Sequence, residues 1–556
     1  MKKKKRILII FLSVVLGLAI SLYAIIYFLA GAGREIGEPL PKGTVDIPVE
    51  RSMHYSSTSQ LQQEIIDYWT NGKITDWVDG EKPDLKSPRT VLGCLLAGKR
   101  VEEINEYLMK QKATGTAGSR WLLNPKGGYN FTTMACTPIL FLFDDKPDLL
   151  YPETKKHLVE DILTIQGVGF SRNVPGLPMQ DTENHILMAE SSRYLKNQWL
   201  WDNGNKSPEF DNRNNSVEEG LKNYLKEILD YGVYEYNSDP YLGYTYSSLL
   251  NLNAFATGDV QEYATKILDM INWQYALNSY KFKHFPPYRR RFKDAFDKSI
   301  ISDYHSVMLM VWADFYNDSL KFDISTGKHH ALWASMLPYR PSDKVMEWTL
   351  NKPNPYFVKM GHGYNSCPEI VSGDRSYLLS AGGANQGRSS LIMAKPTVLF
   401  LDDDAKELKD IFHMYGPGED LIDWNNTGVY EDFACCKGKV HAPEGKYALF
   451  TSNNWEVFPI SENIYLAVYS EDELGIMAIV RAESAEKALN IIIENNSDKK
   501  LLKKQFNHPN GNFIEYDLDS PKDKWLITKV NKKVVDREFD KWPFFDGDIE
   551  GSMQNF

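Results

Sequence analysis

The spacing of hydrophobic residues changes once along this chain, and that change constrains the fold more than any other feature. Between residues 56 and 336, apolar side chains recur at helical spacing in segments separated by Gly, Pro, Asn and Asp. From residue 356 to 556 the pattern becomes one of short β-branched or aromatic runs bounded by turn residues. At 556 residues the chain is also too long for a single hydrophobic core. We therefore expect a helical domain followed by a β domain.

The helical part shows no repeat of fixed period. Its helical spacing is clearest over residues 61–69, 154–165, 186–199, 217–229, 244–256, 263–277 and 304–316. Because no short motif recurs at a constant interval, a simple solenoid is not indicated. Many antiparallel helices joined by long loops fit an α/α toroid, an incomplete helical barrel whose loops at one end form a cleft.

Prolines gather between the two parts. Four of them lie between residues 337 and 355, which we interpret as an interdomain linker. The strand-like runs that follow are 377–381, 397–401, 464–468, 476–480, 489–493 and 525–528. Together they predict an antiparallel β-sandwich over residues 356–556.

A basic head and a long apolar run open the chain. The run Ile7–Ala30 holds 24 uncharged residues. At about 1.5 Å per residue it is long enough to span roughly 30 Å of hydrocarbon. The positive-inside rule then predicts a cytoplasmic head and transmembrane anchor over residues 1–32, a stalk over 33–55, and domains exported to the periplasm or cell surface. Residues 30–32 resemble a cleavage site, so secretion after removal of a signal is the alternative.

Charge and cysteine content narrow the partners. A net charge of −11 argues against nucleic acid as a partner, although a local basic cleft would still admit an anionic glycan. The five cysteines are few and odd in number, which disfavours a disulfide framework. The spacing of Cys435 and Cys436 to His441 fits no common zinc pattern. We therefore expect neither a metal nor another cofactor.

An Asn-His pair opens one of the predicted helices. Asp181 or Thr182 can cap this helix, which places Glu183, Asn184 and His185 in its first turn. The free N–H groups at a helix start favour an anion. The alternative interpretation is that His185 packs in a core and Asn184 is a second cap.

A tyrosine-rich segment, residues 234–246, follows. Asp239-Pro240 favours a turn, so Tyr241 is expected at the entrance of the next helix, 56 residues after His185. Tyr244 lies one turn further on. Tyr241 would thus occupy a loop end, as the Asn-His pair does, unless these tyrosines only pack in a core.

These two elements resemble the alginate lyase and heparinase II/III-like polysaccharide lyases. Those enzymes pair an Asn or Asn-His at a helix start with a Tyr at a similar distance, after a Ser-Pro-type turn. The matching pieces here are Asn184-His185 and residues 238–241, and residues 368–383 resemble the entry to their β domain. The tyrosine turn departs from the usual order, which leaves the choice of tyrosine open.

The resemblance implies an α/α toroid and a β domain over nearly everything after the stalk. It also implies a carbon–oxygen lyase that cleaves a uronate-containing polysaccharide by β-elimination, without a metal. Asn184 would bind the uronate carboxylate, together with His185 or an arginine, and stabilise the enolate. Tyr241 or His185 would abstract the C5 proton, and Tyr241 would return a proton to the leaving oxygen.

We expect further residues to join this site. Arg289, Arg290 and Arg291 suit carboxylate or sulfate recognition, although a solvated charge run is the alternative. His305 opens another predicted helix, and His362 lies where the β domain would face the toroid. Glu183 was expected to bind substrate beside Asn184.

Two other functions stay open at this level. A glycoside hydrolase on the same scaffold would need two carboxylates across a sugar, and the sequence offers Asp181, Glu183, Asp239 and Asp303 at predicted loop–helix junctions. A membrane-tethered protein that binds glycans without cleaving them is the other alternative.

Overall fold

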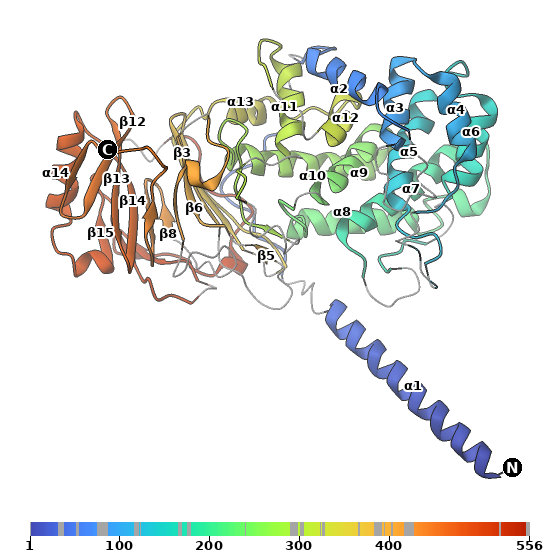
Figure 1. The fold of residues 1–556 in the computed structure, drawn as a ribbon, viewed down its shortest axis with the longest axis horizontal. Coiled ribbons are helices and arrows are strands. Elements are labelled where there is room, and N and C mark those ends of the chain that lie inside the picture. Colours follow the sequence, from blue (N-terminus) through green and yellow to red (C-terminus); the bar gives the residue numbers. More distant parts are fainter. Residues whose placement is uncertain are drawn as a thin grey trace.

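The structure is a computed structural model, and the predicted α+β class is confirmed (Figure 1). It describes residues 2–31, 38–51, 55–74, 87–115, 120, 122, 124–164, 169–174, 180–238, 241–289, 298–300, 305–322, 324, 328–364, 367–382, 392–393, 395–401, 404–415, 428–521 and 524–551. Most helices come first along the chain, and most strands, all of them antiparallel, follow from residue 356 onward.

The helical part occupies one side of the body in Figure 1. Its helices are α2 (Gln60–Thr70), α3 (Ser87–Ala97), α4 (Val101–Lys110), α5 (Asn130–Phe143), α6 (Pro152–His157), α7 (Glu183–Asp202), α8 (Val217–Tyr231), α9 (Tyr241–Phe255), α10 (Gly258–Leu277), α11 (His305–Tyr316), α12 (Lys328–Met336) and α13 (Asp343–Leu350). The predicted segments lie in or overlap these helices. Over residues 154–165 the structure differs from the predicted α-helix, because α6 is followed by a π-helical turn over Leu158–Ile162.

Helix α9 is buried along most of its length and on all of its faces. Residues 242–252 are all buried. Its small polar side chains are accommodated because Ser247 and Ser248 donate to the carbonyls of Gly243 and Tyr244 one turn earlier. Helices α5, α7, α10 and α12 pack around it. A helix enclosed in this way needs no polar face, so α9 carries chemistry-bearing residues at its start without exposing its body.

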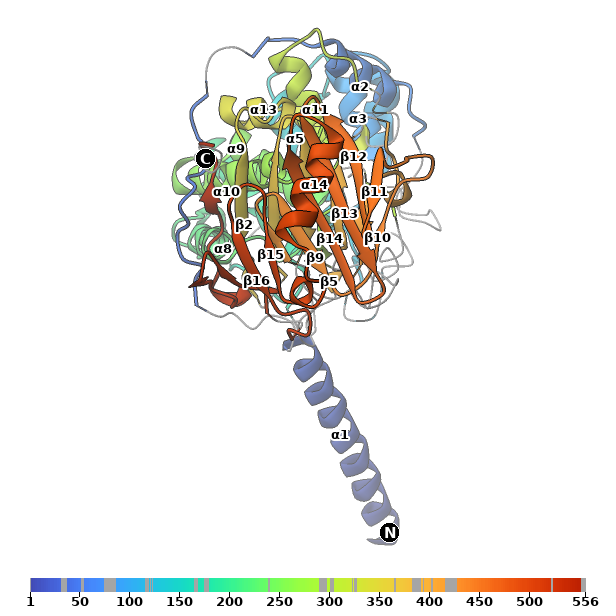
Figure 2. The ribbon, with the colours of Figure 1, turned by 90° about the vertical axis from the view of Figure 1, so that its left-hand side faces the viewer.

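The β part contains three larger antiparallel sheets (Figures 1 and 2). In the seven-stranded sheet the order is β10 (Val440–His441), β7 (Phe412–Met414), β6 (Thr397–Phe400), β4 (Tyr377–Gly382), β3 (Glu369–Asp374), β2 (Tyr356–Met360) and β19 (Asp546–Asp548). In the six-stranded sheet it is β11 (Phe450–Ser452), β12 (Trp455–Ser461), β13 (Ile464–Glu471), β14 (Leu474–Arg481), β9 (Phe433–Cys436) and β8 (Gly428–Tyr430). A four-stranded sheet joins β15 (Gln505–Asn507), β16 (Phe513–Tyr516), β17 (Ile527–Val530) and β18 (Lys533–Val534).

The seven-stranded sheet is buried on both faces. Along β4 and β6, successive side chains alternate between two cores: Leu378 and Val398 belong to the core shared with the helices, whereas Leu379 and Leu399 belong to the core shared with the six-stranded sheet. This alternation follows from the two-residue period of a strand. The sheet therefore joins the helical part to the rest of the β part. A short two-stranded sheet of β1 (Tyr288–Arg289) and β5 (Ile392–Met393) adds a second link.

Two segments differ from their predictions. Residues 489–493 were predicted as a strand but lie in helix α14 (Ala485–Asn495). Ser484 caps this helix, and Ala485, Ala488, Leu489 and Ile492 form its buried face at helical spacing. The predicted linker over 337–355 contains α13, whose Val345 and Trp348 are buried against the helical part. Its prolines therefore lie where the helices give way to the strands, within a packed region.

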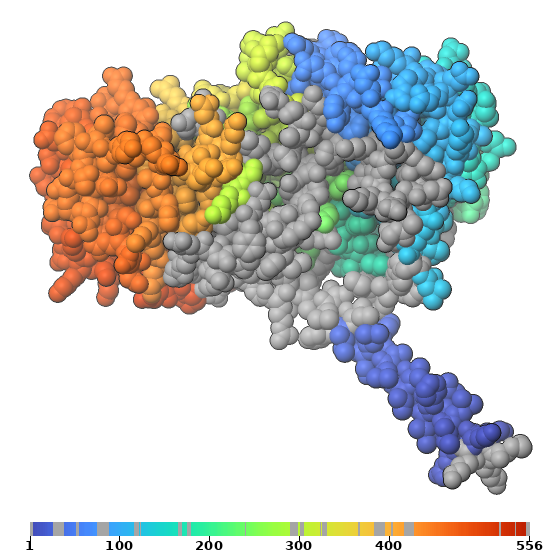
Figure 3. Space-filling view, in the orientation of Figure 1, coloured from blue at the N-terminus to red at the C-terminus, as the bar shows by residue number. Residues whose placement is uncertain are grey.

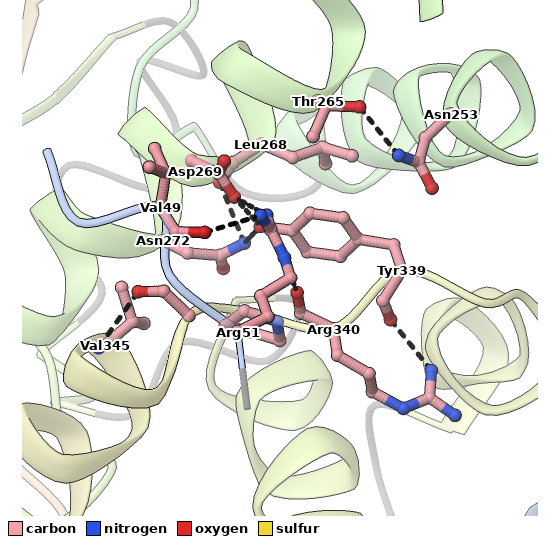
Figure 4. Close-up of polar contacts among 12 residues, drawn as sticks. Val49, Arg51, Asn253, Thr265, Leu268, Asp269, Asn272, Tyr339, Arg340 and Val345 are labelled. Carbon is pink, nitrogen blue, oxygen red and sulfur yellow. Dashed lines mark hydrogen bonds and ion pairs between the residues drawn. The ribbon is translucent and has the colours of Figure 1, made fainter. Parts of the chain in front are cut away.

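The segment after the first helix is extended and bonded to the body, where a stalk was expected. Leu40 and Val45 donate backbone hydrogen bonds to the carbonyls of Asp230 and Phe545. Figure 2 shows this blue segment following one side of the body toward α2. Further along, the Arg51 guanidinium contacts the Asp269 carboxylate on α10 and donates to the Arg340 carbonyl (Figure 4). Residues 38–51 thus connect α1 to both parts of the molecule.

Helix α1 (Lys2–Gly31) projects away from the body (Figures 1 and 3). Its stretch Lys4–Ile25 is long and apolar enough to cross a membrane, and none of it is buried. By length and composition this helix suits either a membrane anchor or a signal sequence. All five cysteines are buried, and none of them is in a disulfide.

Candidate functional site

Two glutamates join the start of α7 to the loop before α9. The Glu183 carboxylate accepts the Tyr234 backbone N–H at 2.8 Å. In return, the Glu235 carboxylate accepts the Asn184 backbone N–H at 3.4 Å. Both glutamates are buried, with exposed fractions of 1% and 0%. The first turn of α7 therefore obtains its N-terminal cap from a loop fifty residues away, since Thr182 makes no capping bond with its own side chain.

An aromatic ring connects the Asn-His helix to the tyrosine helix. Phe131, at the start of α5, lies edge-on to the His185 ring at 5.0 Å and to the Tyr244 ring at 4.9 Å between centroids. The beginnings of α5, α7 and α9 consequently lie together at one end of the helical part. Free N–H groups at helix beginnings give such a region a positive potential.

The neighbour of His185 determines which of its ring nitrogens carries the proton. The Asn130 amide nitrogen is 3.3 Å from the His185 carbonyl, a contact in which only the amide nitrogen can donate. The same nitrogen lies 2.8 Å from Nδ1 of His185 and donates there as well. Nδ1 is then an acceptor, so the neutral ring carries its proton on Nε2. His185 is therefore arranged as a hydrogen-bond donor through Nε2.

A pocket of about 430 Å³ lies beside His185. That volume falls within the range typical of small-ligand sites, roughly 300–1,000 Å³. Its lining comprises Asn124, Lys126, Gly127, Gly128, Tyr129, Asn130, Ser171, Asn173, Val174, Asp181, His185, Ile186, Ala189, Glu190 and Arg193. Of the predicted catalytic residues, His185 is the one found in this lining.

Asn184 lies beneath the surface, with an exposed fraction of 0%. Its Oδ1 accepts the Thr182 hydroxyl at 2.6 Å, while its Nδ2 has no hydrogen-bond partner among the residues that the structure describes. Leaving a buried donor unsatisfied costs about 1–3 kcal/mol. A buried amide without a partner is typical of a group whose missing hydrogen bond is supplied by a ligand, or by a movement of the residues that cover it.

The tyrosines occupy the expected positions. Tyr241 is the first residue of α9 and is half-buried. Tyr244 is buried against Phe131. Tyr241 follows within three residues of the loop that Glu183 and Glu235 hold against α7. The structure thus links His185 to Tyr244 through Phe131, and Tyr241 lies one turn before Tyr244 on the same helix.

The predicted arginine cluster is only partly described. Arg289 is buried, stacks on the Tyr234 ring at 4.0 Å and donates to the Tyr364 carbonyl at 2.9 Å. Arg289 thus contacts the loop before α9 through Tyr234, and these contacts are those of a positioning residue. Arg290 and Arg291 lie outside the described residues.

His305 is separated from this neighbourhood by its burial in an aromatic core. It begins α11, and its Nε2 lies 2.5 Å from the Tyr246 hydroxyl. The Tyr275 ring packs against it at 4.4 Å. Burial lowers the pKa of His305 well below its usual value, which keeps the imidazole neutral. These contacts do not bring His305 to the pocket.

His362 and Glu369 form a buried polar network between the helices and β3. The Glu369 carboxylate accepts hydrogen bonds from His362 at 2.9 Å, Asn237 at 2.7 Å, Gln274 at 2.5 Å and also from Asn278. These donors outweigh the effect of burial and hold the pKa of Glu369 below its usual value, so the group stays ionised. Through Asn237 this charge fixes the loop before α9 to the seven-stranded sheet.

His362 itself stacks on a ring of the same loop. The Tyr236 and His362 rings lie 3.9 Å apart and nearly parallel. His362 thus contacts both Glu369 and the loop before α9, and its role in binding substrate stays a prediction. The loop 234–238 is held on three sides, by α7, by Arg289 and by Glu369.

The carboxylates named for a hydrolase are distributed differently. Asp181 lines the pocket, whereas Glu183 is buried and bound to the backbone of the loop. Asp239 and Asp303 lie outside the described residues. No cluster of three or more metal-ligating side chains occurs within the described ranges.

Four residues that contact this region were not singled out by the sequence patterns. Asn130, Glu190, Glu235 and Glu369 all contact the site or the loop that holds it. Asn130 would have been the easiest of these to find from the sequence, since an Asn that follows Gly127-Gly128 closely is a local signal for a helix start. The others contact partners that are distant in sequence.

A scan against models of known protein families and a search of curated proteins gave no match for this chain.

Proposed function

We propose that this protein is a polysaccharide lyase that cleaves a uronate-containing glycan by β-elimination. The observation that supports this most strongly is the pair of bonds between Glu183, Glu235 and the facing backbones, which hold the Asn-His turn beside the tyrosine-bearing loop. Asn and His donors beside a tyrosine at helix beginnings suit an anionic ring that must lose a proton next to its carboxylate.

Each residue has a defined part in the proposed reaction. His185 donates from Nε2 to the uronate carboxylate, and the buried Asn184 amide joins it once the substrate displaces its covering. The phenolic oxygen of Tyr241 takes the C5 proton. The electrons form the C4–C5 double bond, the C4–O bond breaks, and the departing oxygen receives a proton from Tyr241. Tyr244 and Phe131 keep these side chains in position.

The finer architecture belongs to the same proposal. We propose that α2–α13 form an incomplete α/α toroid, that the sheets form an antiparallel β-sandwich, and that α1 anchors the exported domains in a membrane. The basic residues before the apolar stretch of α1 support the orientation with the head in the cytoplasm. The attachment of residues 38–51 to the body supports a short connection between anchor and domains.

The test is to incubate the full chain in detergent with a panel of uronate-containing glycans. A lyase produces the ultraviolet absorbance of an unsaturated uronate. New reducing ends without that absorbance would instead indicate a hydrolase, for which Asp181 and Glu190 are the carboxylates at the pocket. Binding without cleavage would indicate a glycan-binding protein.

Variants separate the roles within the site. Asn184→Ala, His185→Ala and Tyr241→Phe are each expected to lower kcat by at least about 100-fold while the protein stays folded. Tyr447→Phe is the matched control, because Tyr447 is 84% exposed and belongs to the β part. Full activity in all three site variants would refute the assignment of these residues.

A further inference from the structure

The pocket beside His185 continues along one face of α7. Ile186, Ala189, Glu190 and Arg193 line it, and residues three, four and seven apart share a face of a helix. With a rise of about 1.5 Å per residue, Glu190 lies roughly 7–8 Å along the helix axis from His185. This separation is comparable to one sugar unit, so the far end of the pocket would face the unit next to the one at His185.

Glu190 at this far end is buried and only partly hydrogen-bonded. It has an exposed fraction of 1%, and its Oε1 accepts the Ser171 backbone N–H at 3.4 Å. Its Oε2 has no hydrogen-bond partner within the described ranges, although the Arg193 guanidinium is 3.3 Å away as an ion pair. Burial raises the pKa of Glu190 to about 7. This carboxyl group keeps an unused acceptor at the pocket.

Arg193 offers the complementary group. Its Nη1 donates to the Gly169 carbonyl, which fixes the guanidinium, while its Nε is buried and lacks a partner among the described residues. A buried acceptor and a buried donor that lack partners each destabilise the folded protein. Two such atoms at one pocket are typical of a site that a ligand with both donors and acceptors completes.

The charges around the pocket are balanced. Among the described lining residues, Lys126 and Arg193 are cationic and Asp181 and Glu190 are acidic. Lys126 donates to the Thr164 hydroxyl at 3.0 Å. A site for a chain with a negative charge on every unit would be expected to carry an excess of cations. The Glu190 carboxyl group would repel a second anion placed against it.

We propose that Glu190 and Arg193 form a subsite for a neutral, hydroxyl-bearing sugar unit adjacent to the uronate at His185. The carboxyl oxygen accepts a sugar hydroxyl, and Arg193 Nε donates to a neighbouring one. The pair thereby selects glycans in which the uronate has an uncharged neighbour over those in which it has a charged one. This inference rests on the proposed function for the position of the uronate. What it adds is that the protein distinguishes an uncharged from a charged sugar at the neighbouring position.

The experiment measures binding, so that it does not depend on turnover. The full chain in detergent is titrated with two oligosaccharides of equal length, one alternating glucuronate with an uncharged N-acetylhexosamine and one composed only of galacturonate. The wild type is expected to prefer the alternating oligosaccharide. Glu190→Gln is expected to reduce that preference about tenfold, equivalent to about 1.4 kcal/mol, by admitting the second uronate. Arg193→Gln is expected to weaken binding of the alternating oligosaccharide, and Glu218→Gln on α8 is the control.

The outcomes distinguish the two proposals. Equal binding of both oligosaccharides by the wild type, no binding of either, or an unchanged preference in a folded Glu190→Gln variant would overturn the subsite. If Glu190→Gln unfolds, an undiminished affinity of Arg193→Gln for the alternating oligosaccharide overturns it instead. Binding with the expected preference but without any unsaturated product would support the subsite and refute the lyase.

Discussion

Neutralising Glu369 is expected to destabilise the junction between the helices and the seven-stranded sheet. Its carboxylate is completely buried and accepts hydrogen bonds from four side chains on three different segments. The lowered pKa of Glu369 shows that these donors stabilise the charged form by more than burial opposes it. Glu369→Gln removes the charge and turns an amide N–H₂ group toward at least one donor.

The magnitude follows from the bonds. Hydrogen bonds to a charged group contribute about 1.5–3 kcal/mol each, against about 1 kcal/mol for neutral pairs. The loss over four bonds is partly offset by the lower desolvation cost of an amide. We expect Glu369→Gln to lower the free energy of unfolding by about 3–5 kcal/mol, as for other broken buried ion contacts. Because domains are stable by only about 5–15 kcal/mol, this loss should be readily measured.

The assay is urea denaturation of the full chain in detergent, followed by tryptophan fluorescence. Glu456→Gln, an exposed carboxylate-to-amide change on β12, is the control. A group with a lowered folded pKa adds stability above its unfolded pKa, and this is lost as the pH falls through the folded value. The difference between wild type and Glu369→Gln should therefore shrink below about pH 4. A loss under about 0.5 kcal/mol at neutral pH would refute the reasoning.

Three further outcomes are expected. Arg51→Met should destabilise the protein by about 2–4 kcal/mol, because it leaves the buried Asp269 carboxylate without its cation, and adding Asp269→Asn should restore at least half of the loss in a double-mutant cycle. Burial raises the folded pKa of Glu190 to about 7, so the stability that the protonated group contributes is fully present below about pH 4.5 and is lost as the pH rises through 7. Glu190→Gln should therefore be more stable than the wild type by up to about 3 kcal/mol at pH 8. A difference in thermal unfolding that does not depend on pH would contradict this. Phe131→Ala should cost about 1–2 kcal/mol and lower turnover more than Phe131→Leu does, since the ring separates His185 from Tyr244.

The sequence was sufficient where a signal repeats along one element. Apolar residues at helical spacing predicted the segments that form α7 and α9, and β-branched or aromatic runs bounded by turn residues predicted β4 and β6. It was misleading at 489–493, because a short run of Ile and Leu has too few residues to separate a strand from one face of a helix. The cap at Ser484 and the alanines before that run were the local signals that favour the helix.

The site divides in the same way. The Asn-His turn and the tyrosine turn were found from sequence because both are helix beginnings, which are marked by neighbouring residues. Their proximity was not determined locally: it depends on Glu183, Glu235 and Phe131, whose partners lie on other elements. Likewise, the placement of Arg289 and His362 in supporting contacts was decided by which buried groups needed partners.

The sequence by itself therefore determined the α+β order of the chain, the apolar first helix and the residues at the helix beginnings, because each depends on the period or the capping of a single segment. Only the tertiary structure decided that Glu235 caps α7, that Glu369 joins the tyrosine loop to β3, and that Glu190 and Arg193 face the same pocket as His185. The physical reason is that a buried polar group must find a partner wherever packing provides one, and that partner can be any distance away in the chain.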